Sequence, residues 1–435
     1  MKITIDSYKN IHDLTIPVVN NKLILLGANG VGKTNTLEAV FYNECRIEDA
    51  PCTYARRFLL SMDLLSNDDY YPNANIIREM FPDITLDNLQ EKLMIFLENA
   101  YKHQNRPMMR KMIQDALDTL TYCISNKNFD PSPLAITRLA VLYKIYHDSI
   151  RTGEKYIVLV DSPELFAHPM MMDEIVNVLL SLAEAGCLVI ITTHNEHVIS
   201  RFFTSFDEIV MVVKGVDGQM GMLTVDMKAI ISEIRAFYRQ DEYLTHSFSR
   251  MSHVDDGLVE LLENNLESYL ITAFRDRIIT IFFSETMVLG EGASEDVLFD
   301  YICNVAHPQW ISEHQTGFLN CMGKSTMPIY FIFLNHLGIR TFLLYDLDNP
   351  ANLVHDAYHR YFDAYHFANP SLFASYYLNP DLEGYLNITN GERVRSIIKP
   401  LGIFRYTYMQ KEENPRLGKL IDLMEENILR MKEAR

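Results

Sequence analysis

The stretch GANGVGKT at residues 27–34 decides the fold of the first part of the chain. It follows the short apolar run Lys22–Leu26, and the spacing of apolar residues from Asn35 onward predicts a helix. Glycines in such a loop let backbone N–H groups curl around phosphate, and the start of a helix favours an anion. The pattern GxxxxGK[ST] between a strand and a helix therefore predicts a nucleotide-binding phosphate loop.

Individual residues of this loop have expected roles. Lys33 would reach the β- and γ-phosphates, and Thr34 would bind Mg²⁺. The alternative is a glycine turn before a helix, but a chance match in a chain of this length is on the order of 1 in 100. The residues that we expect to bind ATP here are Asn29, Gly30, Gly32, Lys33 and Thr34.

Composition narrows the range of functions. The chain has 435 residues, of which 48% are hydrophobic and 22% are charged, as in folded globular proteins. Its 39 basic and 57 acidic residues give a net charge of −18, which argues against a general nucleic-acid coat or a polybasic membrane binder. A local basic groove stays compatible with that charge. With no long apolar run, no secretory signal and scattered cysteines, we expect a cytoplasmic protein without a membrane partner.

The order of the expected elements predicts an α/β chain with two domains. Residues 1–226 form a phosphate-loop domain that contains a mostly helical insertion at about 46–150. A helical connector or dimerisation region follows at 227–281, and a smaller α/β domain occupies 282–435.

Two further strand ends belong with the phosphate loop. The apolar run Tyr156–Val160 ends in Asp161, and a second run beginning at Leu188 ends near His194. Because ligands bind where the carboxyl ends of parallel strands meet, we expect both side chains beside the nucleotide. Asp161 can hold Mg²⁺ through water. Either residue alone would more often be structural, so the expectation rests on the combination.

A second set of residues consists of carboxylates after apolar strands. Glu291 follows Thr286–Gly290, and Asp346 and Asp348 follow a run that begins at Arg340. Clustered carboxylates repel one another unless cations neutralise them, and Mg²⁺ and Mn²⁺ prefer oxygen ligands. Two such ions can activate water and stabilise a leaving oxygen in phosphodiester cleavage. Solvated acids at loop ends are the alternative for either motif alone.

These motifs resemble known families. The alternating start, the phosphate loop, Asp161 and His194 resemble an ABC-type ATPase of the RecF/SMC-like group. The string PELFAHP at 163–169 is similar to the OLD (overcoming lysogenization defect) family, and a glutamate followed later by D-x-D resembles a Toprim domain. The resemblance implies an ABC-type P-loop ATPase domain with a helical insertion, followed by a small Toprim α/β domain. That is the layout of the OLD family, which recurs in bacterial anti-phage systems, including Gabija and retron effectors.

The resemblance also implies site residues. Asp161 would be the Walker B carboxylate and His194 the switch histidine. In the Toprim domain, a late lysine would stabilise the transition state, and the candidates are Lys399 and Lys419, of which we take Lys399. The implied catalytic residues are Glu291, Glu295, Asp346, Asp348, Glu383 and Lys399, with the five acids as ligands of Mg²⁺ or Mn²⁺ and with Glu295 and Glu383 at a second metal.

The sequence departs from the ATPase pattern at two points. Ser162 stands where the family places a glutamate that polarises the attacking water, and a hydroxyl is a poor base near neutral pH. Glu164 lies two residues further along. The signature segment that begins at Ser132 and includes Arg138 lacks the usual glycine and glutamate. We therefore expect a site that binds ATP well and hydrolyses it slowly or not at all.

The leading interpretation is an ATP-regulated, metal-dependent nuclease that cleaves DNA and assembles as a homodimer or higher homo-oligomer through its ATPase domain. A regulatory protein or a nucleic acid could restrain it. The alternatives are an ATP-gated scaffold or sensor without catalysis, and a RecF-like DNA-repair ATPase. Basic patches at Arg56–Arg57 and Asn105–Lys111 could contact DNA phosphates, although such short patches are usually solvated.

Overall fold

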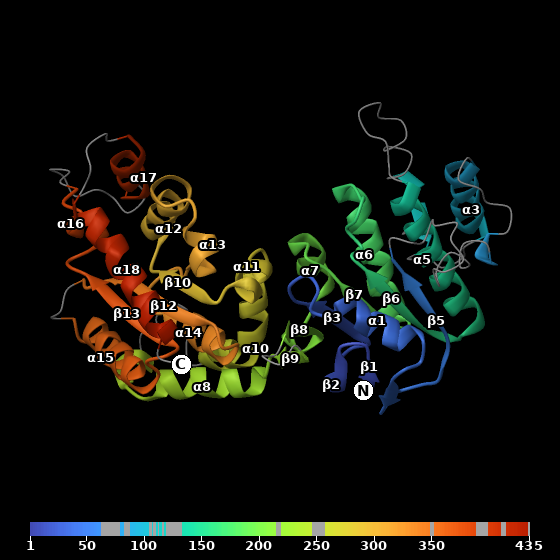
Figure 1. Ribbon diagram of the computed structural model, residues 1–435, viewed down its shortest axis with the longest axis horizontal. Helices are drawn as coiled ribbons and strands as arrows, with labels where there is room; N and C mark the ends of the chain where they lie inside the picture. Colours follow the sequence, from blue (N-terminus) through green and yellow to red (C-terminus); the bar gives the residue numbers. More distant parts are fainter. Residues whose placement is uncertain are drawn as a thin grey trace. The chain divides into compact units, whose positions relative to one another are not determined.

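The computed structural model describes residues 1–61, 79–81, 88–103, 107, 110–111, 113–114, 117–118, 133–214, 219–245, 257–348, 352–388, 399–409 and 415–433. The chain divides into two compact units (Figure 1). The first comprises residues 1–225 and 271–279, and the second comprises residues 226–270 and 280–435. Each unit contains its own parallel sheet.

The main sheet of the first unit is built around strand β3 (Lys22–Leu26), which precedes the phosphate loop. All five residues of β3 are buried, as expected for a central parallel strand covered on both faces. Only the last pair of strands is antiparallel. The strand order is β5 (Tyr54–Leu60), β6 (Lys155–Asp161), β7 (Leu188–Thr192), β3, β8 (Ile209–Lys214) and β9 (Met220–Thr224).

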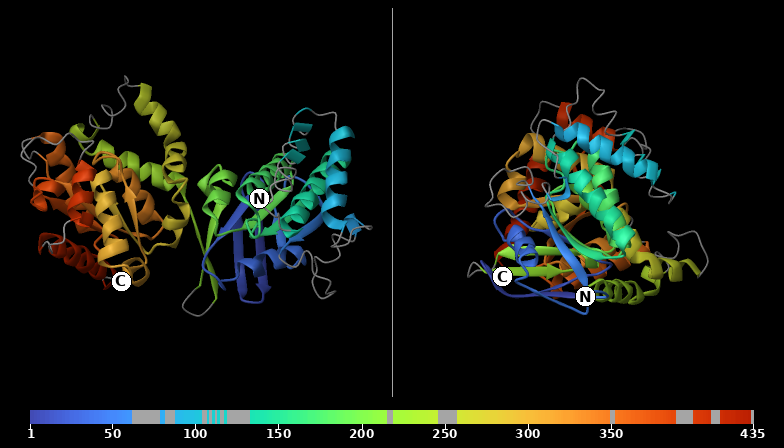
Figure 2. Two further views of the ribbon diagram at one scale, coloured as in Figure 1. Left: turned by 90° about the horizontal axis from the view of Figure 1, so that it is seen from above. Right: turned by 90° about the vertical axis from the view of Figure 1, so that its right-hand side faces the viewer.

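Helices and a small antiparallel sheet complete the first unit. Helices α5 and α6 run side by side (Figure 2). The small sheet packs Ile3 and Ile5 into the same core as Leu23 and Leu25 of β3. The remaining elements are β1 (Lys2–Tyr8), β2 (Ile11–Pro17), β4 (Arg46–Glu48), α1 (Lys33–Phe41), α3 (Leu89–His103), α5 (Pro133–Thr152), α6 (Pro169–Glu184), α7 (Glu196–Phe202) and the 3₁₀ helix η3 (Phe206–Glu208).

The expectation of a mostly helical stretch from residue 46 is wrong for its first part. Residues 46–48 form β4, and residues 54–60 form β5, which pairs in parallel with β6. The buried end of β5, Phe58–Leu60, packs in the main sheet. This pairing joins residues about a hundred positions apart, so the local pattern of residues 54–60 could not reveal it.

The second unit has an all-parallel sheet, and its strand register determines which residues meet at the carboxyl edge. The strand order is β11 (Thr316–Asn320), β10 (Thr286–Gly290), β12 (Arg340–Asp346) and β13 (Phe373–Leu378). Gly290 at the end of β10 lies opposite Leu344 of β12. The residues that follow Gly290 and Leu344 therefore meet at one edge of the sheet.

Helices cover this sheet, and Phe237 of α8 packs on Phe331 of α14 with their ring centroids 5.8 Å apart. Among the described helices, none is long and apolar enough to span a bilayer. The other helices are α8 (Met227–Arg239), α10 (Gly257–Phe274), α11 (Ile278–Phe283), α12 (Ala293–Tyr301), α13 (Trp310–His314), α14 (Met327–His336), α15 (Leu353–Ala368), α16 (Leu382–Tyr385), α17 (Lys399–Phe404), α18 (Pro415–Glu433) and the π-helical turns at Ile302–Ala306 and Arg405–Met409.

The phosphate loop offers a matched pair of glycines for a stability test. Gly27 and Gly30 both have positive φ, +143° and +78°, but only at Gly27 would an added Cβ overlap the carbonyl oxygen of Val212. An alanine at Gly30 carries a backbone cost of about 1–2 kcal/mol for its left-handed conformation, and an alanine at Gly27 is strained by both its φ and this overlap. We expect Gly27→Ala to lower the unfolding temperature clearly more than Gly30→Ala in differential scanning calorimetry. Equal losses would contradict this role of Gly27.

Candidate functional site

The phosphate loop and the carboxyl ends of β6 and β7 enclose a cavity of about 330 Å³. All seven residues that the sequence predicts for ATP binding line this one cavity. Its lining consists of Asn29, Gly30, Gly32, Lys33, Thr34, Asn35, Asp161, Ser162, Leu165 and His194. Asn35 and Leu165 are additions that the sequence motif did not indicate.

The groups expected around a triphosphate and its metal ion are already close together. The Lys33 ammonium donates to the carbonyl oxygens of Gly27 at 2.6 Å and of Ala28 at 2.9 Å. The Thr34 hydroxyl donates to a carboxylate oxygen of Asp161 at 3.0 Å. Burial lowers the pKa of Lys33, while the charge of Asp161 opposes that shift. Hydrogen bonds therefore hold Lys33, Thr34 and Asp161 in fixed positions around the cavity.

Ser162 and Glu164 have different places in the structure. Ser162 lines the cavity, with its hydroxyl 3.5 Å from Asp161. The Glu164 carboxylate accepts hydrogen bonds from the Thr193 hydroxyl at 2.9 Å and from the His194 backbone N–H at 3.3 Å. Glu164 is not part of the cavity lining. Instead, it contacts the segment that carries His194.

Arg138 supports the same loop from helix α5, whereas the sequence analysis named it only as part of the expected signature segment. Its side chain is fully buried and donates to the carbonyl oxygens of Ser162 at 3.2 Å and Pro163 at 2.9 Å. Burial lowers the pKa of Arg138 to about 10, opposed by Glu164 and Asp161. Ser132, the start of the expected signature segment, lies outside the described residues.

A second cavity, of about 420 Å³, lies at the carboxyl edge of the second sheet. Five of the six residues predicted to be catalytic line it, and Asp348 is the exception. The lining consists of Glu291, Gly292, Ala293, Ser294, Glu295, Asn320, Met322, Gly323, Asp346, Glu383, Lys399 and Pro400. The strand register thus brings together side chains that are up to about a hundred positions apart in the sequence.

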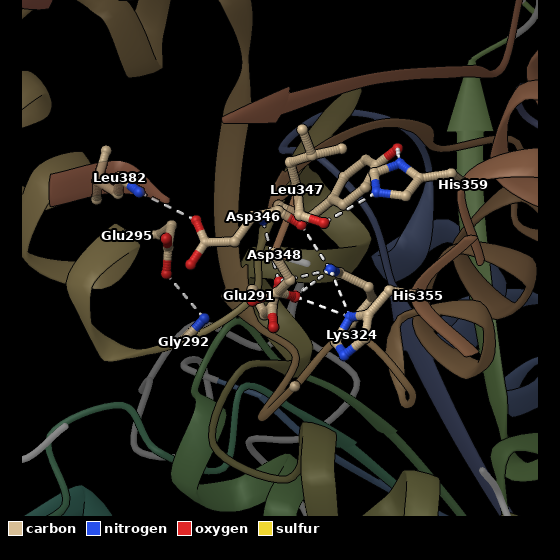
Figure 3. A network of polar contacts seen from close by, with 12 residues as sticks. Glu291, Gly292, Glu295, Lys324, Asp346, Leu347, Asp348, His355, His359 and Leu382 are labelled. Carbon is tan, nitrogen blue, oxygen red and sulfur yellow. Dashed lines mark hydrogen bonds and ion pairs between the residues drawn. The ribbon is translucent and has the colours of Figure 1, made fainter. Parts of the chain in front are cut away.

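Backbone N–H groups orient the three central carboxylates of this cavity (Figure 3). Glu291 accepts from the N–H of Asp346 at 3.1 Å. Glu295, in the first turn of α12, accepts from the N–H of Gly292 at 2.8 Å. Asp346, at the end of β12, accepts from the N–H of Leu382 at 3.1 Å. Each carboxylate therefore has a fixed orientation at the edge of the sheet.

These carboxylates are largely shielded from solvent, and this raises their pKa values. Burial raises the pKa of Asp346 to about 9, and the charges of Glu295 and Glu291 add to the shift. Burial also raises the pKa of Glu295 to about 7, against the hydrogen bond from Gly292. Burial raises the pKa of Glu291 as well, although Lys324 opposes it. A bound cation would oppose these shifts, because a nearby positive charge favours the ionised carboxylates.

Lys399 is the late lysine that the structure brings to this cavity. Its ammonium lies 3.0 Å from Asp381 and 3.4 Å from Glu383. Burial opposes the charged form of Lys399, but the hydrogen bond to Asp381 and the charge of Glu383 raise its pKa overall. The alternative, Lys419, is an exposed residue of α18 and is not part of the lining. The geometry therefore favours Lys399.

Asp348 belongs to a different group of contacts, which sequence reasoning missed. It pairs with the Lys324 ammonium at 2.5 Å and with His355 at 2.9 Å. Lys324 directly follows Gly323, the turn residue after β11, so a basic residue in that loop was the available signal. His355 lies on α15, and nothing local in the sequence connects it to Asp348.

The donor set suits a hard divalent cation, because it consists of carboxylate oxygens that lack full neutralisation. Glu295 is buried and Asp346 is half-buried, and neither makes an ion pair with a basic side chain of the described residues. Within those residues, no three Asp, Glu, His or Cys side chains are grouped so that they could hold one metal ion as they stand. Metal binding would therefore include a local closure of the carboxylates.

The predicted basic patches receive little support as DNA contacts. Arg56 and Arg57 lie on strand β5, where Arg56 pairs with Glu79 and Arg57 donates to the Val40 carbonyl oxygen. Arg57 also donates to Asn43 at 2.6 Å. In the second patch, four of the seven residues, at 105, 106, 108 and 109, lie outside the described residues.

One segment of the second unit matches a known family. Residues 282–348 match the family described as "Overcoming lysogenization defect protein-like, TOPRIM domain". The chain is 24% identical over 198 residues to the Old nuclease of Escherichia phage P2. This match covers 46% of the chain but only 28% of the phage protein.

Solved structures of ATP-binding cassettes resemble parts of the chain weakly. A dimeric cassette in a post-hydrolysis state bound to ADP and phosphate is 15% identical, covers 51% of this chain and 97% of its own, and has a TM-score of 0.30. A nucleotide-free cassette from an ABC transporter is 14% identical, covers 53% and 94%, and also has a TM-score of 0.30. The α/β fold of the first unit is shown by its own strand order and phosphate loop.

The raised pKa values of Asp346 and Glu295 predict a pH-dependent stability without metal. The folded chain keeps protons on both groups that the unfolded chain releases near pH 4, so stability falls as the pH rises from about 4 towards 9. The slope is at most about 1.4 kcal/mol per pH unit for each group. In EDTA, we expect the unfolding temperature to fall between pH 5 and 9, and Mg²⁺ to restore it.

Two variants check the origin of this effect. Asp346→Asn should flatten the pH dependence, whereas Asp422→Asn, which changes an exposed carboxylate of α18, should leave it as it is. A pH profile that is the same in both variants would show that the buried carboxylates do not cause it.

Proposed function

We propose that the chain is a divalent-metal-dependent nuclease of the OLD family, in which an ATPase-type unit precedes a Toprim domain, and that it cleaves DNA under the control of ATP; the family match of residues 282–348 and the similarity to the Old nuclease support this proposal. We further propose that it acts in the cytoplasm as an anti-phage effector and assembles as a homodimer or higher oligomer through the ATPase unit. These finer points are supported by the family resemblance.

The observation that carries the proposal is the convergence of buried carboxylates and Lys399 on one cavity. Asp346, Glu295, Glu291 and Glu383 would hold Mg²⁺ or Mn²⁺. The metal would supply an activated water and charge stabilisation for the leaving oxygen. Lys399, the first residue of α17, can place a positive charge beside a phosphate that enters the cavity.

ATP has a different role in the proposal. The cavity at the phosphate loop has the residues that bind a triphosphate, but Ser162 occupies the position of the water-polarising glutamate. Glu164 is committed to the segment of Thr193 and His194. We infer that bound ATP acts as a structural effector and is hydrolysed slowly.

The nuclease activity can be tested with supercoiled plasmid DNA and Mg²⁺ or Mn²⁺. We expect cleavage by the unaltered protein, and we expect Asp346→Ala to reduce it by more than the roughly 10–100-fold that changes beside a metal ligand cost. Asp422→Asn is the matched control and should cleave normally. Absence of cleavage with every metal and nucleotide would favour the scaffold alternative.

The ATP role can be tested by measuring binding and phosphate release separately. We expect the protein to bind a fluorescent ATP analogue, and we expect Lys33→Ala to lose that binding because the ammonium lies at the phosphate loop. Phosphate release should be slow in the unaltered protein. Rapid release that disappears in Lys33→Ala would support the repair-ATPase alternative instead.

A further inference from the structure

Met322 places an apolar side chain at a cavity that is lined mainly by carboxylates. Among the described residues that line the cavity of the second sheet, Met322 has the largest apolar side chain. It is 76% exposed, so it lies at the opening of the cavity and not in the core. Mg²⁺ and Mn²⁺ prefer oxygen ligands to a thioether. The proposed cleavage chemistry therefore gives this side chain no role.

The backbone conformation of Met322 is unfavourable for a methionine. Its φ is +59°, in the left-handed region that favours glycine, and its N–H donates to the side-chain oxygen of Asn320 at 2.9 Å. Because the side chain is mostly exposed, the burial of apolar surface does not offset this cost. Backbone strain that packing does not offset is a reason to look for a functional contact.

The loop is anchored on both sides of Met322. The Cys321 N–H donates to the Gly290 carbonyl oxygen at 2.9 Å, and the Gly323 N–H donates to the Glu291 carbonyl oxygen at 2.8 Å. Both are backbone bonds to the end of β10, so a closure of the carboxylate side chains around a metal ion does not have to break them. The position from which the methionine side chain projects is therefore fixed relative to the sheet.

DNA offers a partner for an apolar side chain at this place. A strand that brings a phosphate into the cavity also brings the sugar and the bases on either side of that phosphate to the opening. Apolar side chains, methionine among them, can insert between two stacked bases, which unstacks them and kinks the duplex. The flexible and polarisable thioether makes favourable contacts with aromatic rings. A side chain on an anchored loop can enter the stack without being pushed aside.

We propose that Met322 is a wedge residue, which inserts between the bases beside the phosphate to be cleaved and unstacks them. The kinked strand then brings that phosphate down to the carboxylates of the cavity. DNA that is already unpaired or easily unstacked is accordingly a better substrate than a regular duplex. The inference rests on the proposed DNA nuclease and adds a residue that selects among its substrates.

The test compares cleavage of a fully paired oligonucleotide duplex with cleavage of the same duplex carrying a central unpaired bubble, using the full chain and Mn²⁺. Met322→Ala should cleave the paired duplex at least roughly tenfold more slowly, because the wedge is lost. It should cleave the bubble at a nearly unchanged rate, since those bases are already unstacked. Met322→Leu, which keeps an apolar wedge, should retain duplex cleavage. Met409→Ala, which truncates a methionine that is 67% exposed and lies outside the cavity lining, should behave as the unaltered protein.

Equal losses of Met322→Ala on the two substrates, or no loss on the duplex, would overturn the wedge while leaving the nuclease in place. Absence of cleavage of both substrates by the unaltered protein would refute the proposed nuclease itself.

A second variant separates the contact with DNA from a role in folding. Glycine adopts a positive φ without the steric cost, so Met322→Gly should unfold at a higher temperature than Met322→Ala in differential scanning calorimetry. It should nevertheless cleave the paired duplex as slowly as Met322→Ala does. If Met322→Gly instead unfolds well below the unaltered protein, the side chain stabilises the fold and the assignment as a wedge is wrong.

Discussion

Carboxylates can be buried together only where positive charge compensates them or protons neutralise them, and this constraint shapes the edge of the second sheet. The register of β10 and β12 forces Glu291 and Asp346 to the same edge, and the first turn of α12 adds Glu295. Lys324 and Lys399 neutralise the two sides of the group. Glu295 and Asp346 keep raised pKa values because they are shielded from solvent and lie near other carboxylates. A cation bound beside them would favour their charged forms.

The strand ends of the first unit carry fewer carboxylates than those of the second unit. Its strand ends present one carboxylate, Asp161, which already has hydrogen-bond donors in Thr34 and Thr192. The charge that needs compensation there is that of the incoming phosphates, and the phosphate loop with Lys33 supplies it. Both cavities therefore lie at the carboxyl ends of parallel strands, but the first contains a lysine on a glycine-rich loop, whereas the second is lined mainly by carboxylates.

Sequence reasoning succeeded where chemistry restricts the residues locally. The phosphate loop allows few substitutions, and D-x-D after an apolar strand is a compact pattern, so both could be recognised from neighbouring positions. Lys324, Arg138 and His355 were missed because their roles depend on contacts between distant segments. Asp348 shows the limit of a motif, since it stands in the expected position but faces Lys324 and not the cavity.

The environment of Asp161 is consistent with the proposed role of ATP as an effector that is hydrolysed slowly. Arg138 of α5 holds the carbonyl groups of Ser162 and Pro163, and Glu164 from the same loop holds Thr193 and His194. Helix α5, the loop after β6 and the segment after β7 are therefore joined through one set of hydrogen bonds beside the nucleotide cavity. A γ-phosphate that contacts His194 would act on this set whether or not it is cleaved. Efficient hydrolysis needs a base next to the attacking water, and Glu164, two residues after Ser162, is already engaged by Thr193 and His194. Its engagement in positioning favours a long-lived ATP-bound state.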